Sequence, residues 1–63
     1  MKIYLQEIRT KKNISIRKLS VMTGIARSYI MRIEKGKANP TLSVLCKLCK
    51  ALEVNLSDLV SCD

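Results

Sequence analysis

The sequence predicts an all-α domain, and three observations lead to this prediction. Apolar residues recur at helical spacing, the single proline and the two glycines fall at segment boundaries, and no stretch alternates polar and apolar residues as a strand would. The 63 residues contain no internal repeat or low-complexity tract. We therefore expect one compact domain over residues 1–63, built from about five helices.

The first two helices are predicted by the residues that begin and end them. A helix is expected over about residues 2–12, before the stop residue Asn13. A second is expected over about residues 16–23, because Ser15 is a favourable N-cap and Gly24 a favourable terminator. The apolar positions at helical spacing are Leu5, Ile8, Ile16, Leu19 and Met22.

The third, fourth and fifth helices are predicted from caps, terminators and residue spacing in the same way. Residues 26–34 are expected to form a third helix that turns Ile30 and Ile33 inward and ends near Gly36. Residues 37–40 are expected to form a loop, since the position before a proline avoids helical backbone. The fourth and fifth helices, over about residues 42–60, have Thr41 and Asn55 as caps and carry the apolar residues Leu42, Leu45, Leu48, Cys49, Leu52, Leu56, Leu59 and Val60.

Basic residues are concentrated in one part of the chain. Residues 8–37 hold nine of the twelve Lys and Arg against one acid, Glu34, which gives a net charge of +8. Residues 38–63 carry two bases against three acids, a net charge of −1. Clustered Lys and Arg bind polyanions by neutralising phosphates and releasing counterions. We therefore expect one face for nucleic acid and a different contact on the other.

The composition argues against several classes of protein. The chain has no histidine, the most common general base and metal ligand, and it is too short for a catalytic cleft with supporting residues. We expect no enzyme, no cofactor and no small-molecule ligand. No apolar run approaches the roughly 20 residues of a membrane span, and no signal peptide is visible, so we expect a cytoplasmic protein without membrane contact.

The three cysteines are expected to have a packing role. An odd number does not make a disulfide framework, which fits a reducing compartment. Cys46 and Cys49 are spaced C-x-x-C, but a structural zinc site needs about four ligands and only the distant Cys62 remains. Redox sensing or metal binding is the less favoured alternative.

The middle of the chain resembles a known family. Only Thr23-Gly24-Ile25 separate the second and third helices, and two helices joined by such a turn form a helix-turn-helix. The residues from NISIRKLS to GIARSYI (13–30) resemble the phage-repressor-like (Cro-type, xenobiotic-response-element) helix-turn-helix family. IEKGKANP (33–40) resembles that family's turn after the recognition helix, and KALEVNLSDL (50–59) resembles its last two helices. The resemblance extends over about residues 4–60.

The resemblance implies a compact five-helix lambda-repressor-like domain whose recognition helix, residues 26–34, enters the major groove of double-stranded DNA. The expected DNA-contact residues are Arg17, Lys18, Ala26, Arg27, Ser28, Tyr29, Met31, Arg32, Lys35 and Lys37. Arg27 and Arg32 each have a guanidinium that fits the acceptors of guanine. The alternatives are solvated surface charges for the arginines, packing for Tyr29, surface filling for Met31 and a purely helical role for Ala26.

Two positions depart from the family pattern, and one pair follows it. Ile16 stands where a glutamine is common, so one phosphate contact is in question. Ala26 stands where Ser or Thr often caps the recognition helix, and alanine caps poorly. The resemblance also implies an ion pair between Arg9 and Glu34, although Glu34 facing solvent beside Lys35 is the alternative.

These expectations combine into one functional hypothesis. The chain is predicted to be a sequence-specific DNA-binding transcriptional regulator, expected to be a repressor, although the sequence does not separate repression from activation. It is predicted to form a homodimer through the helices of residues 42–60, on a palindromic or pseudo-palindromic operator. The alternatives are a monomer with a frayed last helix and a protein-interaction or antitoxin-type module with the same fold. RNA binding is a weaker alternative, because two tyrosines make no stacking platform.

Overall fold

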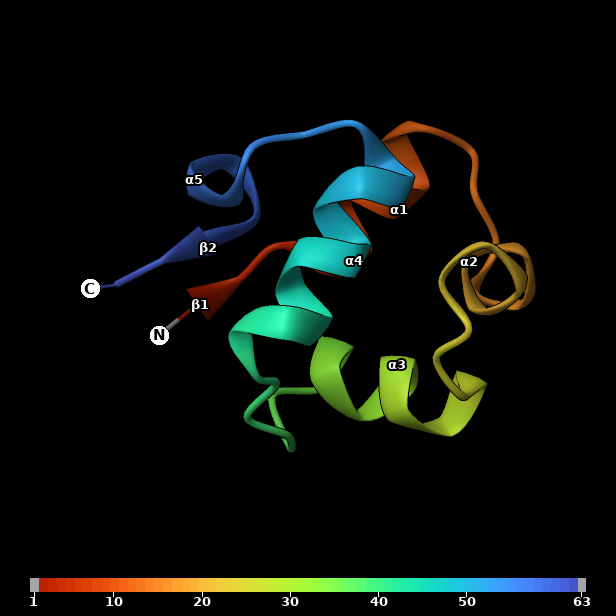
Figure 1. Cartoon of the computed structure of the whole chain (residues 1–63), viewed down its shortest axis with the longest axis horizontal. Coiled ribbons are helices and arrows are strands. Elements are labelled where there is room, and N and C mark those ends of the chain that lie inside the picture. Colours follow the sequence, from red (N-terminus) through yellow and green to blue (C-terminus); the bar gives the residue numbers. More distant parts are fainter. Residues whose placement is uncertain (1, 63) are drawn as a thin grey trace.

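Helices make up most of the computed structural model, which describes residues 2–62 (Figure 1). The elements are, in chain order, β1 (Lys2–Ile3), α1 (Leu5–Lys11), α2 (Ile16–Thr23), α3 (Arg27–Glu34), α4 (Leu42–Leu52), α5 (Leu56–Leu59) and β2 (Val60–Ser61). Within the described residues, the prediction of five helices is therefore confirmed. Residues 1 and 63 of the predicted domain lie outside the described part.

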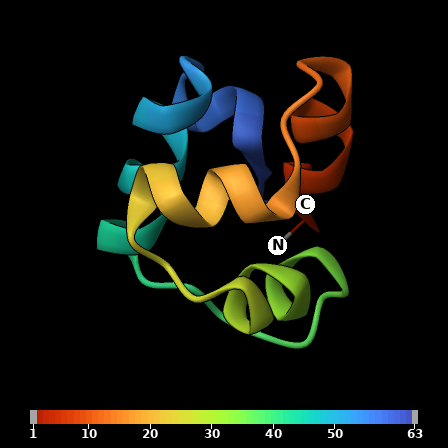
Figure 2. The same ribbon diagram turned by 90° about the vertical axis from the view of Figure 1, so that its right-hand side faces the viewer.

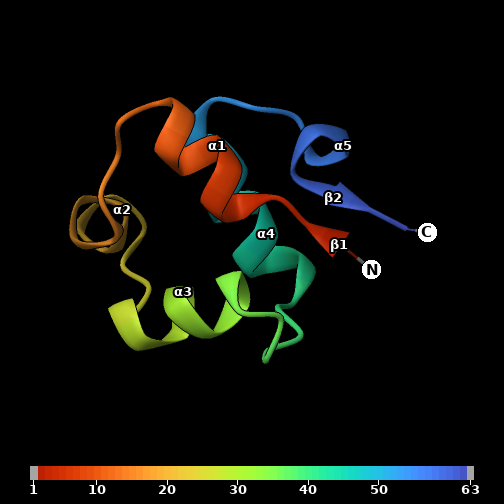
Figure 3. The ribbon, with the colours of Figure 1, turned by 180° about the vertical axis from the view of Figure 1, so that it is seen from behind.

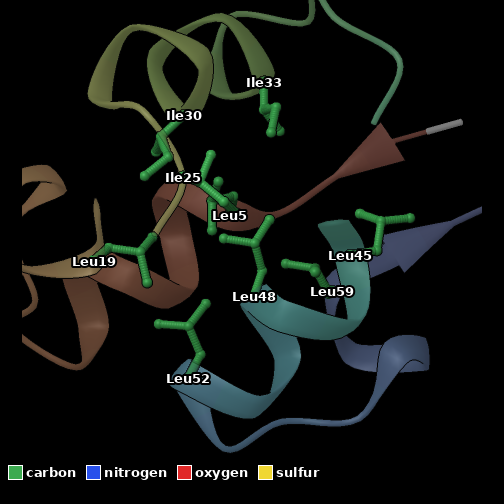
Figure 4. Packing of buried hydrophobic residues seen from close by; sticks show 9 residues of the cluster. All are labelled: Leu5, Leu19, Ile25, Ile30, Ile33, Leu45, Leu48, Leu52 and Leu59. Atoms are coloured by element: carbon green, nitrogen blue, oxygen red, sulfur yellow. The ribbon is translucent and has the colours of Figure 1, made fainter. Parts of the chain in front are cut away.

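A single core connects all five helices. It consists of Leu5, Leu19, Ile25, Ile30, Ile33, Leu45, Leu48, Leu52 and Leu59, each at most 9% exposed (Figure 4). In Figure 1 helix α4 lies in front of α1, and the view from behind in Figure 3 reverses their order. Full burial of such a side chain stabilises the fold by about 1.5–3 kcal/mol. With nine such residues in the described part of the chain, each contributes a large share of the stability.

Side-chain caps begin the helices where the sequence predicted them. The Ser15 hydroxyl accepts a hydrogen bond from the backbone N–H of Lys18 at 3.0 Å, at the start of α2. The Thr41 hydroxyl accepts one from the N–H of Val44 at 3.3 Å, at the start of α4. Each bond satisfies a backbone donor that the first helical turn leaves without a partner.

Residues with a left-handed backbone conformation follow helices α1, α2 and α3. Gly24 has φ 74° after α2, and Gly36 has φ 72° just after α3. Asn13 also adopts a positive φ, 57°, after α1, as expected of a stop residue that tolerates this conformation. These three positions fix where the chain reverses before and after the helix pair α2–α3.

The prediction was wrong at the two ends of the chain. The first helix begins at Leu5 and not near residue 2, and Val60 lies in a strand and not in the last helix. Strands β1 and β2 pair antiparallel, with Ile3 opposite Val60. The backbone N–H of Tyr4 extends this contact by donating to the carbonyl of Leu59 at 2.8 Å. Two-residue strands are too short to show alternation, and the partner lies at the other end of the sequence, so no local pattern could indicate the pair.

Candidate nucleic-acid interface

The turn between α2 and α3 is held by side-chain hydroxyl groups. The Thr23 hydroxyl donates to the carbonyl of Leu19 at 2.8 Å and accepts from the N–H of Ile25 at 3.2 Å. The Ser20 hydroxyl donates to the carbonyl of Ile25, whose side chain is buried. In Figure 2 helix α2 runs across the view above α3, which is seen nearly end-on. The turn residues therefore fix the direction in which α3 leaves α2.

Ser20 and Thr23 were not predicted to have this role. Their residue types could have indicated it, because Ser and Thr hydroxyls often form hydrogen bonds with nearby backbone groups beside a turn. The turn was predicted from Gly24 instead. Together the hydroxyl groups and Gly24 satisfy the backbone groups of a tight connection.

Helix α3 has one buried and one exposed face. Ile30 and Ile33 are at most 1% exposed and belong to the core, as predicted from their spacing. The opposite side carries the exposed residues Arg27, Ser28, Met31 and Arg32, followed by Lys35 at the C-cap. A surface helix with these two faces presents its polar side chains on a well-supported frame.

The first turn of α3 has no side-chain cap. Ala26 occupies the N-cap position and makes no capping hydrogen bond, in agreement with its residue type. The first backbone N–H groups of α3 thus have no side-chain acceptor there. Free N–H groups at a helix start attract anions such as phosphate.

An open cleft separates the first turns of α2 and α3. It is lined by Ile16, Arg17, Arg27, Ser28 and Met31. Two guanidinium groups therefore stand beside two apolar side chains in the same hollow. This combination suits a partner that presents both negative charge and small apolar groups.

Other predicted contact residues do not line this cleft. Lys18 is exposed on α2, and Lys35 and Lys37 are exposed at the end of α3 and in the turn that follows. Tyr29 differs from them, because it is half-buried and packs against the core. The ring of Tyr29 therefore takes part in packing, which was the alternative to a DNA contact for this residue.

Two lysines from the basic segment lie elsewhere. Lys11 and Lys12 line a hollow with Ile8, Val54 and Asp58, between the end of α1 and the C-terminal elements. The continuous basic segment of the sequence is therefore divided between two surfaces in the fold. Sequence order alone could not separate them.

Arg9 and Glu34 form a bidentate ion pair between α1 and α3. Arg9 Nε lies 2.7 Å from Glu34 Oε2, and Nη2 lies 3.3 Å from Oε1. The third donor, Nη1, bonds to the backbone carbonyl of Ile14 at 3.0 Å. The side chains are 14% and 7% exposed, respectively. Losing one partner of such a pair leaves a poorly solvated charge, which costs about 3–5 kcal/mol.

The cysteines show no arrangement for metal binding. Cys46 and Cys62 are exposed, Cys49 is half-buried, and all three are free thiols. Burial raises the pKa of the Cys49 thiol, and the neighbouring Cys46 and Asp58 raise it further. A thiol with a raised pKa stays protonated at neutral pH, and the protonated form is a poor metal ligand and nucleophile. Among residues 2–62, no three His, Cys, Asp or Glu side chains are grouped so that they could hold a metal ion.

Within the same residues, no helix has the length and apolar character needed to cross a membrane.

Comparison of the sequence with known families and proteins shows consistent matches. A helix-turn-helix family model matches residues 5–59. The chain is 40% identical over 52 residues to the HTH-type transcriptional regulator SlrR of Bacillus subtilis, covering 81% of this chain and 34% of SlrR. The chain thus spans about a third of the length of SlrR. It is also 34% identical over 59 residues to the uncharacterized HTH-type transcriptional regulator YgzD of Bacillus subtilis, covering 94% of this chain and 89% of YgzD.

A solved structure supports the same family assignment as the sequence matches. The structure is similar to the crystal structure of the restriction-modification controller protein C.AhdI from Aeromonas hydrophila, with a TM-score of 0.85 and 36% sequence identity. The similarity covers 89% of this chain and 85% of C.AhdI. The predicted fold is therefore confirmed over nearly the whole chain.

We expect replacement of Glu34 by alanine to lower the free energy of unfolding by about 3–5 kcal/mol, because Arg9 would lose its carboxylate partner. Urea unfolding monitored by circular dichroism measures the change. The control is Glu7→Ala, which removes an exposed carboxylate from α1 and should change stability by no more than about 0.5 kcal/mol. Equal stability of the two variants would contradict the role of the ion pair.

Proposed function

This chain belongs to the Cro-type helix-turn-helix family of DNA-binding transcriptional regulators, and we propose that it binds double-stranded DNA sequence-specifically with α3 in the major groove. The observation that carries this proposal is the exposed face of α3. Arg27, Ser28 and Arg32 lie exposed on a helix whose opposite side is anchored by Ile30 and Ile33. A helix in the major groove needs such a polar face on a fixed support.

Base recognition is assigned to the two arginines and the serine of α3. A guanidinium donates two parallel hydrogen bonds to O6 and N7 of guanine, which gives about 1–3 kcal/mol of discrimination for each good pair. The Ser28 hydroxyl both donates and accepts, so it suits either a base edge or a phosphate. Arg27 and Ser28 occupy the first turn of α3, the part that lies nearest the bases when such a helix enters the groove.

Phosphate contacts are assigned to the residues around α3. Arg17 and Lys18 extend from the first turn of α2, and Lys35 and Lys37 follow the end of α3. Their exposed positive charges, on α2 and just after α3, support assigning them to phosphates beside the groove. Phosphate contacts of this kind fix the register of a protein on DNA and make its affinity depend steeply on salt.

We further propose a homodimer through α4 and α5, acting as a repressor. Leu42 at the start of α4 is 62% exposed and Leu56 at the start of α5 is 37% exposed, so both helices carry exposed apolar side chains. A symmetric dimer would bury this surface and place two copies of α3 about one DNA turn apart, roughly 34 Å. Such a dimer bound over a promoter would block access of polymerase to the DNA.

Selection of random duplex DNA by the purified protein at physiological salt, followed by sequencing, tests the function. We expect an enriched motif with two-fold symmetry and half-sites about one helical turn apart. No enrichment by a folded protein would contradict sequence-specific regulation. In that case the protein-interaction or antitoxin-type interpretation would take its place.

We expect Arg27→Ala and Arg32→Ala each to relax base preference at one position of every half-site, with a loss of about 1–3 kcal/mol on the preferred sequence. Repeating the selection with each variant measures the preference, and fluorescence anisotropy measures the affinity. Lys11→Ala is the control, because Lys11 is an exposed base on α1 that lines a different hollow from the α2–α3 cleft. Uniform weakening on all sequences would instead assign the arginine to phosphate.

We expect Leu42→Asp to shift the protein toward monomer, because the new carboxylate would be buried without a partner in the proposed dimer. The helix itself should persist, since an acid in the first turn of α4 interacts favourably with the helix dipole. Sedimentation velocity over a range of concentrations measures the association. The control is Val21→Asp on α2, where the valine is 80% exposed and outside α4 and α5. Equal association of the two variants would contradict the α4–α5 interface.

A further inference from the structure

Two apolar side chains, Ile16 and Met31, line the cleft between α2 and α3, and no chemical group of the DNA has yet been assigned to them. We propose that Ile16 and Met31 together form a binding site for the C5 methyl group of a pyrimidine, which in ordinary DNA is thymine. This inference rests on the proposed function, because it concerns a base in the DNA that α3 contacts. It assigns a residue that the family resemblance left as a departure, and it names the chemical group that the residue recognises.

The position of Ile16 supports this assignment. Its side chain is half-buried, packs against the hydrophobic core and also lines the cleft. A glutamine at this place would donate hydrogen bonds to DNA, whereas isoleucine offers only a rigid apolar surface. Because the core contact restricts its movement, Ile16 forms a fixed wall of the cleft.

Met31 supplies the second apolar side chain that lines the cleft. It lies about one helical turn after Arg27 and Ser28 on α3, on the same exposed face, and 43% of it remains accessible. An unbranched thioether adapts its shape to a neighbouring group. The cleft therefore has one rigid apolar side and one adaptable apolar side.

The charged residues of the cleft orient this site toward DNA. Arg17 and Arg27 line the same hollow as Ile16 and Met31. Their guanidinium groups attract DNA to the opening of the cleft, and Ser28 adds a small polar group at the start of α3. The apolar pair is therefore held beside the groups that are expected to contact phosphates and base edges.

The chemistry of the major groove identifies the ligand. The C5 methyl of thymine is the apolar group that bases present there, whereas the other exposed groups are hydrogen-bond donors and acceptors. Apolar side chains gain from covering a methyl group and lose from covering an unpaired polar group. Burial of one methyl corresponds to about fourfold in affinity, or about 0.8 kcal/mol.

The test uses the best duplex from the selection described above, with each thymine replaced in turn by deoxyuridine. This replacement removes the C5 methyl and keeps every hydrogen-bonding group of the base. We expect about fourfold weaker binding by fluorescence anisotropy at one position of each half-site, and no change at thymines outside the contact.

Two variants connect that position to the proposed pair. In Met31→Ala and Ile16→Ala, the ratio of affinities for the thymine and deoxyuridine duplexes should fall from about four toward one. Met31→Ala is the main variant because Met31 is exposed, whereas Ile16 also contacts the core, so thermal unfolding must show that Ile16→Ala remains folded. Val21→Ala is the matched control on α2. Its side chain is 80% exposed and does not line the cleft, so the fourfold ratio should persist.

The outcomes separate this inference from the proposed function. A selected motif without any deoxyuridine-sensitive position would overturn the methyl site and leave sequence-specific binding intact. A sensitive position whose ratio stays at four in both variants would also overturn it, because the methyl group would then contact other residues. Failure of the selection itself would instead overturn the proposed function, and the methyl site with it.

Discussion

The guanidinium of Arg9 is the point on which the arrangement of the basic face depends. It joins three parts of the chain at once, because it extends from α1, binds Glu34 at the end of α3 and bonds to the backbone of Ile14 just before α2. The only acid in the basic segment is thus used internally, so it does not oppose the surrounding positive charge at the surface. The ion pair therefore supports both the position of α3 and the sign of the potential around it.

Helix α3 shows how a small domain supports a recognition surface. Its apolar residues, Ile30 and Ile33, belong to the core, while the turn before it is held by hydroxyl groups of Ser20 and Thr23. The helix is therefore fixed at its start, along its buried side and at its end. A helix held in this way presents its exposed side chains on a fixed backbone, and such preorganisation lowers the entropic cost of binding a partner.

The local features of the fold could be predicted from the sequence because their causes are local. Ser15 and Thr41 cap the helices expected of them, and Gly24 has the left-handed conformation that its position indicated. The buried face of α3 followed from residue spacing alone. Leu59 was expected among the apolar residues of the last two helices, and it is fully buried because α5 folds back onto the core.

The features that could not be predicted depend on distant parts of the chain. The pairing of Ile3 with Val60 joins the two ends, and no pattern within either segment indicates it. Lys11 and Lys12 belong to the basic segment in sequence but lie beside Asp58 in the fold. The apolar composition of the cleft was equally hidden, because Ile16 and Met31 belong to different helices that meet only after folding.

The pairing of β1 with β2 makes the backbone almost a closed ring. The two ends of the described chain lie side by side, on the side of the molecule away from α2 (Figures 1 and 3). A polypeptide attached at either end would therefore emerge at the same place, on the side away from α2. The same closeness means that a short linker could join the two ends.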